Sequence, residues 1–180
     1  MPARFGRSRS WRRRLAGTRW LSPACACALL LFPQLVLSGQ SLRISSAKAS
    51  RGERVMLQVF LTSPAGSEPL ALQWETTFPA DQLTPLEGGA SPGPVARAAG
   101  KTVTCAVMPK AGGTAGIKCI LIGGQQRIRN GVIVRLRFRV LPEAPGGSAR
   151  VQVDQGIAVF KDLKQAPLKM AEAVVKVRSK

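Results

Sequence analysis

The chain has 180 residues, and 45% of them are hydrophobic, which is enough for one globular domain with a core. It carries 27 lysines and arginines against 9 acidic residues, and it contains no histidine. The absence of histidine excludes His-containing zinc sites, Ser-His-Asp triads and the commonest general base. The carboxylates are scattered, and their spacing does not indicate the facing pair that a glycosidase requires. We therefore expect a protein that is not an enzyme and that needs neither a metal nor another cofactor.

The first 38 residues have the pattern of a secretory signal peptide. Seven arginines and no acidic residue occupy the first twenty positions, an apolar segment follows over residues 21–37, and two small residues come next. The apolar segment is shorter than the roughly 20 residues of a membrane-spanning helix and contains two prolines, which favours cleavage over retention as an anchor. We predict a signal peptide over residues 1–38 and a domain over residues 39–180 that is secreted, either extracellular or periplasmic.

From residue 42 onward, apolar and polar residues alternate over short segments that turn residues separate. Residues 70–78, for example, place Trp74 on one face of a strand and Gln73 on the other. Residues 87–100 are rich in Gly, Pro and Ala, and we predict a loop there. The expected strands cover residues 42–44, 54–62, 70–78, 102–108, 117–122, 131–140, 151–153, 157–160 and 174–177. This pattern predicts an all-β fold, a jelly-roll β-sandwich of about nine strands.

Cys105 and Cys119 face each other if the segments around them pair as an antiparallel hairpin. Pairing residues 102–108 with residues 117–122 places the two cysteines opposite each other, on the apolar inward face. In an oxidising compartment this arrangement favours a disulfide bond. The alternative is two free buried cysteines, because a register slip of one residue would separate the sulfur atoms.

The predicted domain is basic in its own right, because 27 basic residues less the seven N-terminal arginines leaves 20 against 9 acidic ones. Arg135, Arg137 and Arg139 form a stripe on one face of a strand. Four further cations extend this stripe: Arg127, Arg129, Lys161 and Lys164. The stripe is either an anion-binding face for acidic polysaccharide, envelope or nucleic acid, or a solvated face charged for solubility and against edge pairing. No aromatic residues interleave with the arginines as base stacking requires, so we expect no nucleic-acid partner.

Three segments carry a resemblance to a known family. Residues 44–55 have the pattern of a strand, a turn and a second strand at the start of a domain. Residues 70–83 have the pattern of a strand that ends in an aromatic residue and is followed by a leucine. Residues 120–140 contain an Ile-x-Asn-Gly-Val…Leu-x-Phe-x-Val block. In order and spacing, these segments resemble the cohesin domain over roughly residues 42–177. The resemblance implies a nine-strand jelly roll that binds dockerin modules, which carry the calcium themselves, and so assembles polysaccharide-degrading enzymes.

The resemblance also implies where a partner binds, namely on the sheet that carries residues 70–78 and the two hairpin strands. The residues whose parity points outward from that sheet are Gln73, Glu75, Thr77, Thr104, Lys118, Ile120 and Ile122. Two isoleucines on the outer face would form an apolar patch, which is typical of an interaction surface.

We therefore expect a secreted, non-catalytic binding module. The module would bind either a protein partner of the dockerin type or a polysaccharide. In both cases it would act in polysaccharide breakdown. The alternative is a structural subunit of a periplasmic or surface assembly such as a pilus, an adhesin or a secretion apparatus.

Overall fold

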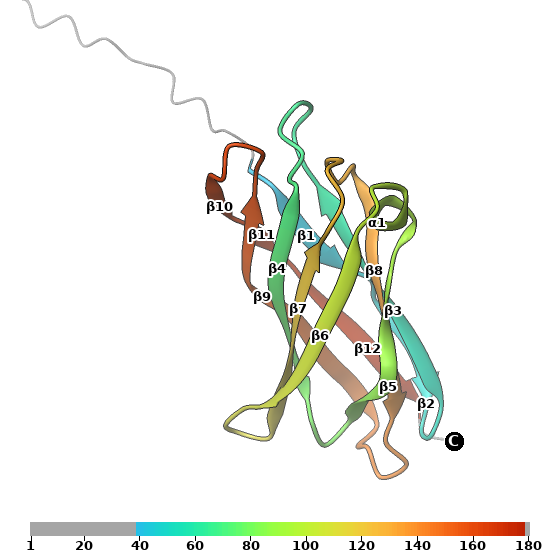
Figure 1. Cartoon of the computed structure of the whole chain (residues 1–180). Coiled ribbons are helices and arrows are strands. Elements are labelled where there is room, and N and C mark those ends of the chain that lie inside the picture. Colours follow the sequence, from blue (N-terminus) through green and yellow to red (C-terminus); the bar gives the residue numbers. More distant parts are fainter. Residues whose placement is uncertain (1–38, 179–180) are drawn as a thin grey trace, which may run out of the picture. The chain divides into compact units, whose positions relative to one another are not determined.

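The computed structural model of the chain describes residues 39–178 (Figure 1). The predicted signal peptide, residues 1–38, lies outside the described residues. Within the described part, the strands are β1 (Ser41–Ile44), β2 (Ala47–Ser50), β3 (Arg54–Thr62), β4 (Ala71–Pro79), β5 (Leu83–Pro92), β6 (Thr102–Pro109), β7 (Thr114–Ile122), β8 (Gly131–Val140), β9 (Gly147–Val159), β10 (Gln165–Pro167), β11 (Lys169–Met170) and β12 (Glu172–Arg178), with one short helix, α1 (Pro94–Ala98).

The strands form two sheets that pack face to face. One sheet has five strands in the order β11-β1-β3-β8-β5. The other has seven, in the order β2-β12-β9-β4-β7-β6 with β10 paired to β9. The predicted all-β sandwich is therefore confirmed.

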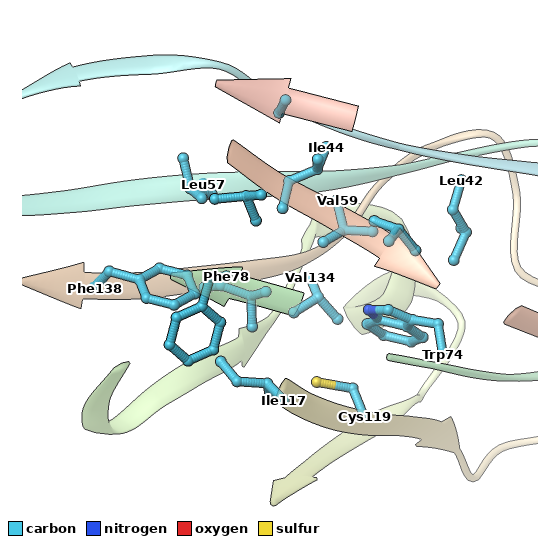
Figure 2. Packing of buried hydrophobic residues seen from close by; sticks show 14 of the residues in the cluster. Leu42, Ile44, Leu57, Val59, Trp74, Phe78, Ile117, Cys119, Val134 and Phe138 are labelled. Atoms are coloured by element: carbon cyan, nitrogen blue, oxygen red, sulfur yellow. The ribbon is translucent and has the colours of Figure 1, made fainter. Parts of the chain in front are cut away.

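The core lies between the sheets and consists of the inward side chains of both (Figure 2). Leu57 and Val59 on β3 and Val134 and Phe138 on β8 supply one side of this core, Trp74 of β4 lies on the other side, and all five side chains are buried. Aliphatic and aromatic residues at every second position supply one apolar face per strand, which is the pattern two packed sheets require.

Phe78 of β4 and Phe138 of β8 make the most specific contact of this core. Their ring centroids lie 5.2 Å apart with planes inclined at 71°, an edge-to-face arrangement. Such aromatic pairs add roughly 0.5–1.5 kcal/mol to the free energy gained by burial alone. Because the two residues belong to different sheets, this contact helps to fix how the sheets align.

The two ends of the domain each contribute a strand to both sheets. The chain passes from β1 in one sheet to β2 in the other, and it passes in the same way from β11 to β12. The pairs β1–β11 and β2–β12 are parallel, so the two terminal segments run side by side. At the crossing, Ser45 Oγ accepts a hydrogen bond from the Gln58 N–H (2.9 Å), and Ser46 Oγ accepts one from the Val174 N–H (3.2 Å). These divided terminal segments add β2 and β11 to the nine strands expected. β5 and β10 are also additional, and the two strands expected over residues 151–153 and 157–160 form one strand, β9.

Residues 87–100 are not the loop that their composition predicts. β5 pairs with β8 up to Pro85 and again from Ala90 to Pro92, and the residues between the two stretches bulge out of the ladder. α1 follows directly, with a proline in its first turn, where the missing N–H costs nothing. Gly93 precedes it and lies so close to the carbonyl group of Val132 that a Cβ atom there would clash with it. Glycine and proline therefore build a bulge and a helix start here.

A bulge in β8 explains one exception to its alternation. The sequence places Ile133 on the outward side with the arginines, yet Ile133 is fully buried. Val59 of β3 faces Val134 and the next residue, Phe60, faces Val132, so Ile133 is the extra residue of the bulge and does not follow the alternation. α1 packs against β8.

Replacing Phe138 by alanine should lower the free energy of unfolding by about 3–5 kcal/mol, because it removes a buried aromatic side chain and its edge-to-face partner. Met56→Ala on the outer side of the same sheet is the control, and it should change stability by less than about 0.5 kcal/mol. Urea unfolding monitored by tryptophan fluorescence would measure both. Equal effects of the two substitutions would contradict this assignment of core and surface.

Candidate functional site

The seven residues selected by parity lie on three neighbouring strands of the seven-stranded sheet. β4 pairs with β7 so that Gln73 faces Ile120 and Glu75 faces Lys118. β7 pairs in turn with β6 so that Ile120 also faces Thr104. Facing residues of antiparallel strands point to the same side of the sheet, so the structure brings these side chains onto one outer face. We call this surface, together with the outward residues of β9, the β4–β7 face.

β9 adds two residues that the sequence reasoning missed. It pairs with the other side of β4, where Ile157 faces Gln73 and Asp154 faces Glu75. A register shift between Gln73 and Glu75, with Gln155 at a positive φ of 46°, keeps both Asp154 and Ile157 on the outer side. The sequence contains no local signal for a pairing between strands about 80 residues apart. The bulge also interrupts the alternation from which the outward position of Ile157 could have been predicted.

One end of the β4–β7 face is apolar. Ile120 is 38% exposed, Ile122 is 50% exposed and Ile157 is 36% exposed. Gln73 lies between Ile120 and Ile157 in the ladder, so these side chains form one patch with an amide at its centre. Scattered exposed apolar residues are ordinary, whereas a contiguous group on one sheet face is typical of an interaction surface.

The other end of the face carries a chain of polar contacts. Lys110, from the turn between β6 and β7, forms an ion pair with Glu75 and donates a hydrogen bond to Thr77 Oγ1 at 2.7 Å. The Thr77 hydroxyl in turn donates to Asp154 Oδ2 at 2.7 Å. Glu75 is only 7% exposed, so little of its side chain is left for direct contact with a partner. Lys110 covers Glu75, and the groups left for a partner at this end are Lys110, Lys118, Thr77 and Asp154.

The disulfide lies at the edge of this face. Cys105 of β6 and Cys119 of β7 are bonded, their Cα atoms lie 4.1 Å apart, and their register is the one that residue parity predicts. Cys119 is fully buried, whereas Cys105 is half-buried and Val107, which also points inward, is 58% exposed. The inner side of β6 is therefore covered only in part, and the covalent bond holds a strand that packing holds weakly.

Lys101 fixes the opposite end of the same hairpin. Its side chain is buried, and Nζ donates hydrogen bonds to the carbonyl oxygens of Gly123 and Gly124, the second at 2.9 Å. Burial lowers the pKa of Lys101, because desolvation disfavours the charged form. The two carbonyl groups offset part of that cost, and they hold the residues that follow Ile122 against the start of β6.

The described residues contain no group of three or more His, Cys, Asp or Glu side chains that could hold a metal ion. No helix within residues 39–178 is long and apolar enough to cross a membrane. The arrangement of the β4–β7 face, with exposed isoleucines beside polar side chains, is suited to binding another macromolecule.

Comparison with solved structures identifies the fold as cohesin-like. The sixth cohesin of scaffoldin B from Acetivibrio cellulolyticus, solved with a dockerin, has a TM-score of 0.62 at 17% identity and covers 78% of this chain and 100% of its own. A type I cohesin solved in complex with a dockerin, from Clostridium thermocellum, has a TM-score of 0.63 at 14% identity, with coverage of 78% and 99%. A non-cellulosomal cohesin from the archaeon Archaeoglobus fulgidus has a TM-score of 0.61 at 13% identity, with coverage of 79% and 93%. No family model matches the sequence, and no curated protein matches it.

Reducing the disulfide should lower the free energy of unfolding by up to about 3 kcal/mol, the chain-entropy value for a closed loop of about 15 residues. Urea unfolding with and without a phosphine reductant would measure the change, with alkylation and intact-mass analysis to report the thiol state. A Cys105→Ala, Cys119→Ala variant is the control, and reductant should leave its stability unchanged. Two freely alkylated thiols from this pair in the native, non-reduced protein would contradict the bond.

Proposed function

We propose that this protein is an exported, non-catalytic module that binds a dockerin-like protein partner through the β4–β7 face. The observation that carries the proposal is the group of exposed isoleucines, Ile120, Ile122 and Ile157, on the outer face of a sheet in a cohesin-like fold. Several of the similar structures are cohesins in complex with dockerins, which supports a protein as the partner.

The β4–β7 face offers a partner two kinds of contact. The isoleucine end can bury apolar side chains, which supplies most of the free energy of association in protein interfaces. The end with Lys110, Thr77 and Asp154 offers a cation, a hydroxyl and a carboxylate in fixed positions, which give specificity and orientation more than affinity. The partner should therefore carry an apolar cluster beside polar groups.

The export and the role in polysaccharide breakdown belong to the same proposal. A signal peptide would deliver the domain to an oxidising compartment, which suits the Cys105–Cys119 disulfide. A protein-binding module in that compartment could hold a polysaccharide-degrading enzyme near its substrate. Cell fractionation distinguishes this proposal from a structural subunit of a surface assembly, because a cleaved, freely released product supports the former and a product retained in the envelope supports the latter.

Replacing Ile120 and Ile122 together by aspartate should weaken binding to the partner by about a hundredfold or more, because two charges would be buried at the apolar centre of the interface. The matched control is Met56→Asp, a residue of similar exposure (48%) on the outer side of the other sheet, and it should leave binding unchanged. Surface plasmon resonance against a panel of purified, calcium-loaded dockerin modules would measure both variants.

Two outcomes would count against the proposal in different ways. Failure of the wild-type protein to bind any dockerin in the panel would contradict a dockerin-type partner. Binding that the double substitution leaves intact and that Met56→Asp abolishes would show that the partner uses the other sheet.

A further inference from the structure

The outer face of the five-stranded sheet carries a band of positive charge. Arg43 lies on β1, Arg54 on β3, and three arginines lie on β8, while β11 adds a lysine opposite Ser41. The register places all six on the outer side, and we call them the basic band: Arg43, Arg54, Arg135, Arg137, Arg139 and Lys169. The band crosses the sheet diagonally from β11 to the end of β8.

Acidic residues do not neutralise this band within the described part of the chain. None of its six members forms an ion pair there. The one carboxylate on β11, β1, β3, β8 or β5 is Glu87, which lies in the bulge of β5 outside the paired positions, and Arg137 donates a hydrogen bond to the neighbouring Gly88 carbonyl instead. The nearby carboxylate of Glu53 accepts a hydrogen bond from the backbone N–H of Ser50 instead. Arg127 and Lys164, which the sequence grouped with the stripe, pair with Glu68 and Asp162 and do not belong to the band.

The basic band includes a pair of facing arginines whose repulsion the fold does not need for its stability. Arg54 and Arg139 face each other directly across β3 and β8, where like charges are destabilising. The solvated-face interpretation accounts poorly for this, because charges of mixed sign give solubility without repulsion. The β2–β12 edge of the other sheet shows the contrast: Lys48 faces Lys176 there, but Glu172 lies on the same strand and pairs with Arg150.

The geometry of the band favours an extended anion over a small one. Arg135, Arg137 and Arg139 span about 13 Å along β8, and Arg43 lies two strands away, about 10 Å across the sheet. Guanidinium groups bind carboxylates through paired hydrogen bonds, which lysine cannot match. Arg43 stacks over Phe60, with Cζ 4.3 Å from the ring centroid, so its position is held by the protein before any ligand arrives.

The residues between the cations indicate the class of polymer. Gln58, Ser91, Thr84 and Thr62 occupy outward positions among the arginines and supply amide and hydroxyl groups. Such groups suit the hydroxyls of a sugar. A membrane-binding surface would present several exposed apolar side chains. Among the outward positions of this sheet, Met56 is the one large, exposed apolar side chain in the described residues. Arg43 covers the ring of Phe60, so that ring does not offer a stacking surface for a base.

We propose that the basic band binds an acidic polysaccharide, a linear polymer with carboxylates on its sugar units. This site is separate from the β4–β7 face, because the two lie on the outer sides of different sheets. The proposal therefore does not depend on a dockerin-like partner.

The test uses the full chain and polygalacturonate, a linear polymer of galacturonic acid, with binding measured by isothermal titration calorimetry at several salt concentrations. Arg54→Gln, Arg139→Gln should weaken binding about tenfold and reduce its salt dependence, because two of the band's charges are lost. The matched control, Lys48→Gln, Lys176→Gln, removes two facing, exposed cations from the other sheet and should leave binding within about twofold. The arginine-rich first twenty residues are the same in every variant, so any binding they contribute is the same in each measurement.

Four further results decide the proposal. Fully methyl-esterified polygalacturonate has the same backbone without charge, and it should bind at least tenfold more weakly than the free acid. Equal losses of affinity for polygalacturonate in the two double variants would contradict the assignment of the binding site to the basic band. Tighter binding to vesicles containing anionic phospholipid, or to single-stranded DNA, than to polygalacturonate would overturn the polysaccharide in favour of that class. Because Arg54→Gln, Arg139→Gln removes a repulsion, its melting temperature should not fall, and a lower one would also contradict the argument.

Discussion

The two-residue alternation of β4 between its neighbours β7 and β9 is the constraint on which the core and the β4–β7 face both depend. Its inward residues include Trp74 and Phe78, which meet the other sheet, and its outward residues include Gln73 and Thr77. A slip of one residue in either pairing would turn Trp74 to solvent and Gln73 into the core. The free energy of burying the aromatic side chains therefore also fixes which polar groups a partner meets.

The β6–β7 hairpin needs support that packing does not give it. β6 is an edge strand, and the inward side chain of Val107 is more than half exposed, so few core contacts hold it. Three devices act along its length: the Lys101 amine at one end, the Cys105–Cys119 bond in the middle, and the Lys110–Glu75 ion pair beside the turn. Because β7 carries Ile120 and Ile122, these devices also hold the apolar end of the face in place.

Most of the fold could be predicted from the sequence, because each long strand has its own alternating pattern and its own turn residues. β3 and β8 have the bounds that their periodicity predicts, and the register around the two cysteines follows from parity. Residues 87–100 and Ile133 could not be assigned correctly, since a bulge and a packed helix depend on neighbouring strands that composition does not reveal. The burial of Glu75 under Lys110 and the position of Ile157 depend on long-range pairing in the same way.

The opposite placement of the two outer faces has a mechanical consequence. The sheets are separated by a core about 10 Å thick, so a ligand on the basic band does not touch the β4–β7 face. If both proposals hold, the domain can bind a polymer with one sheet while the other sheet stays free for a protein. A module with that arrangement links its two ligands through a rigid sandwich, and it needs no conformational change to do so.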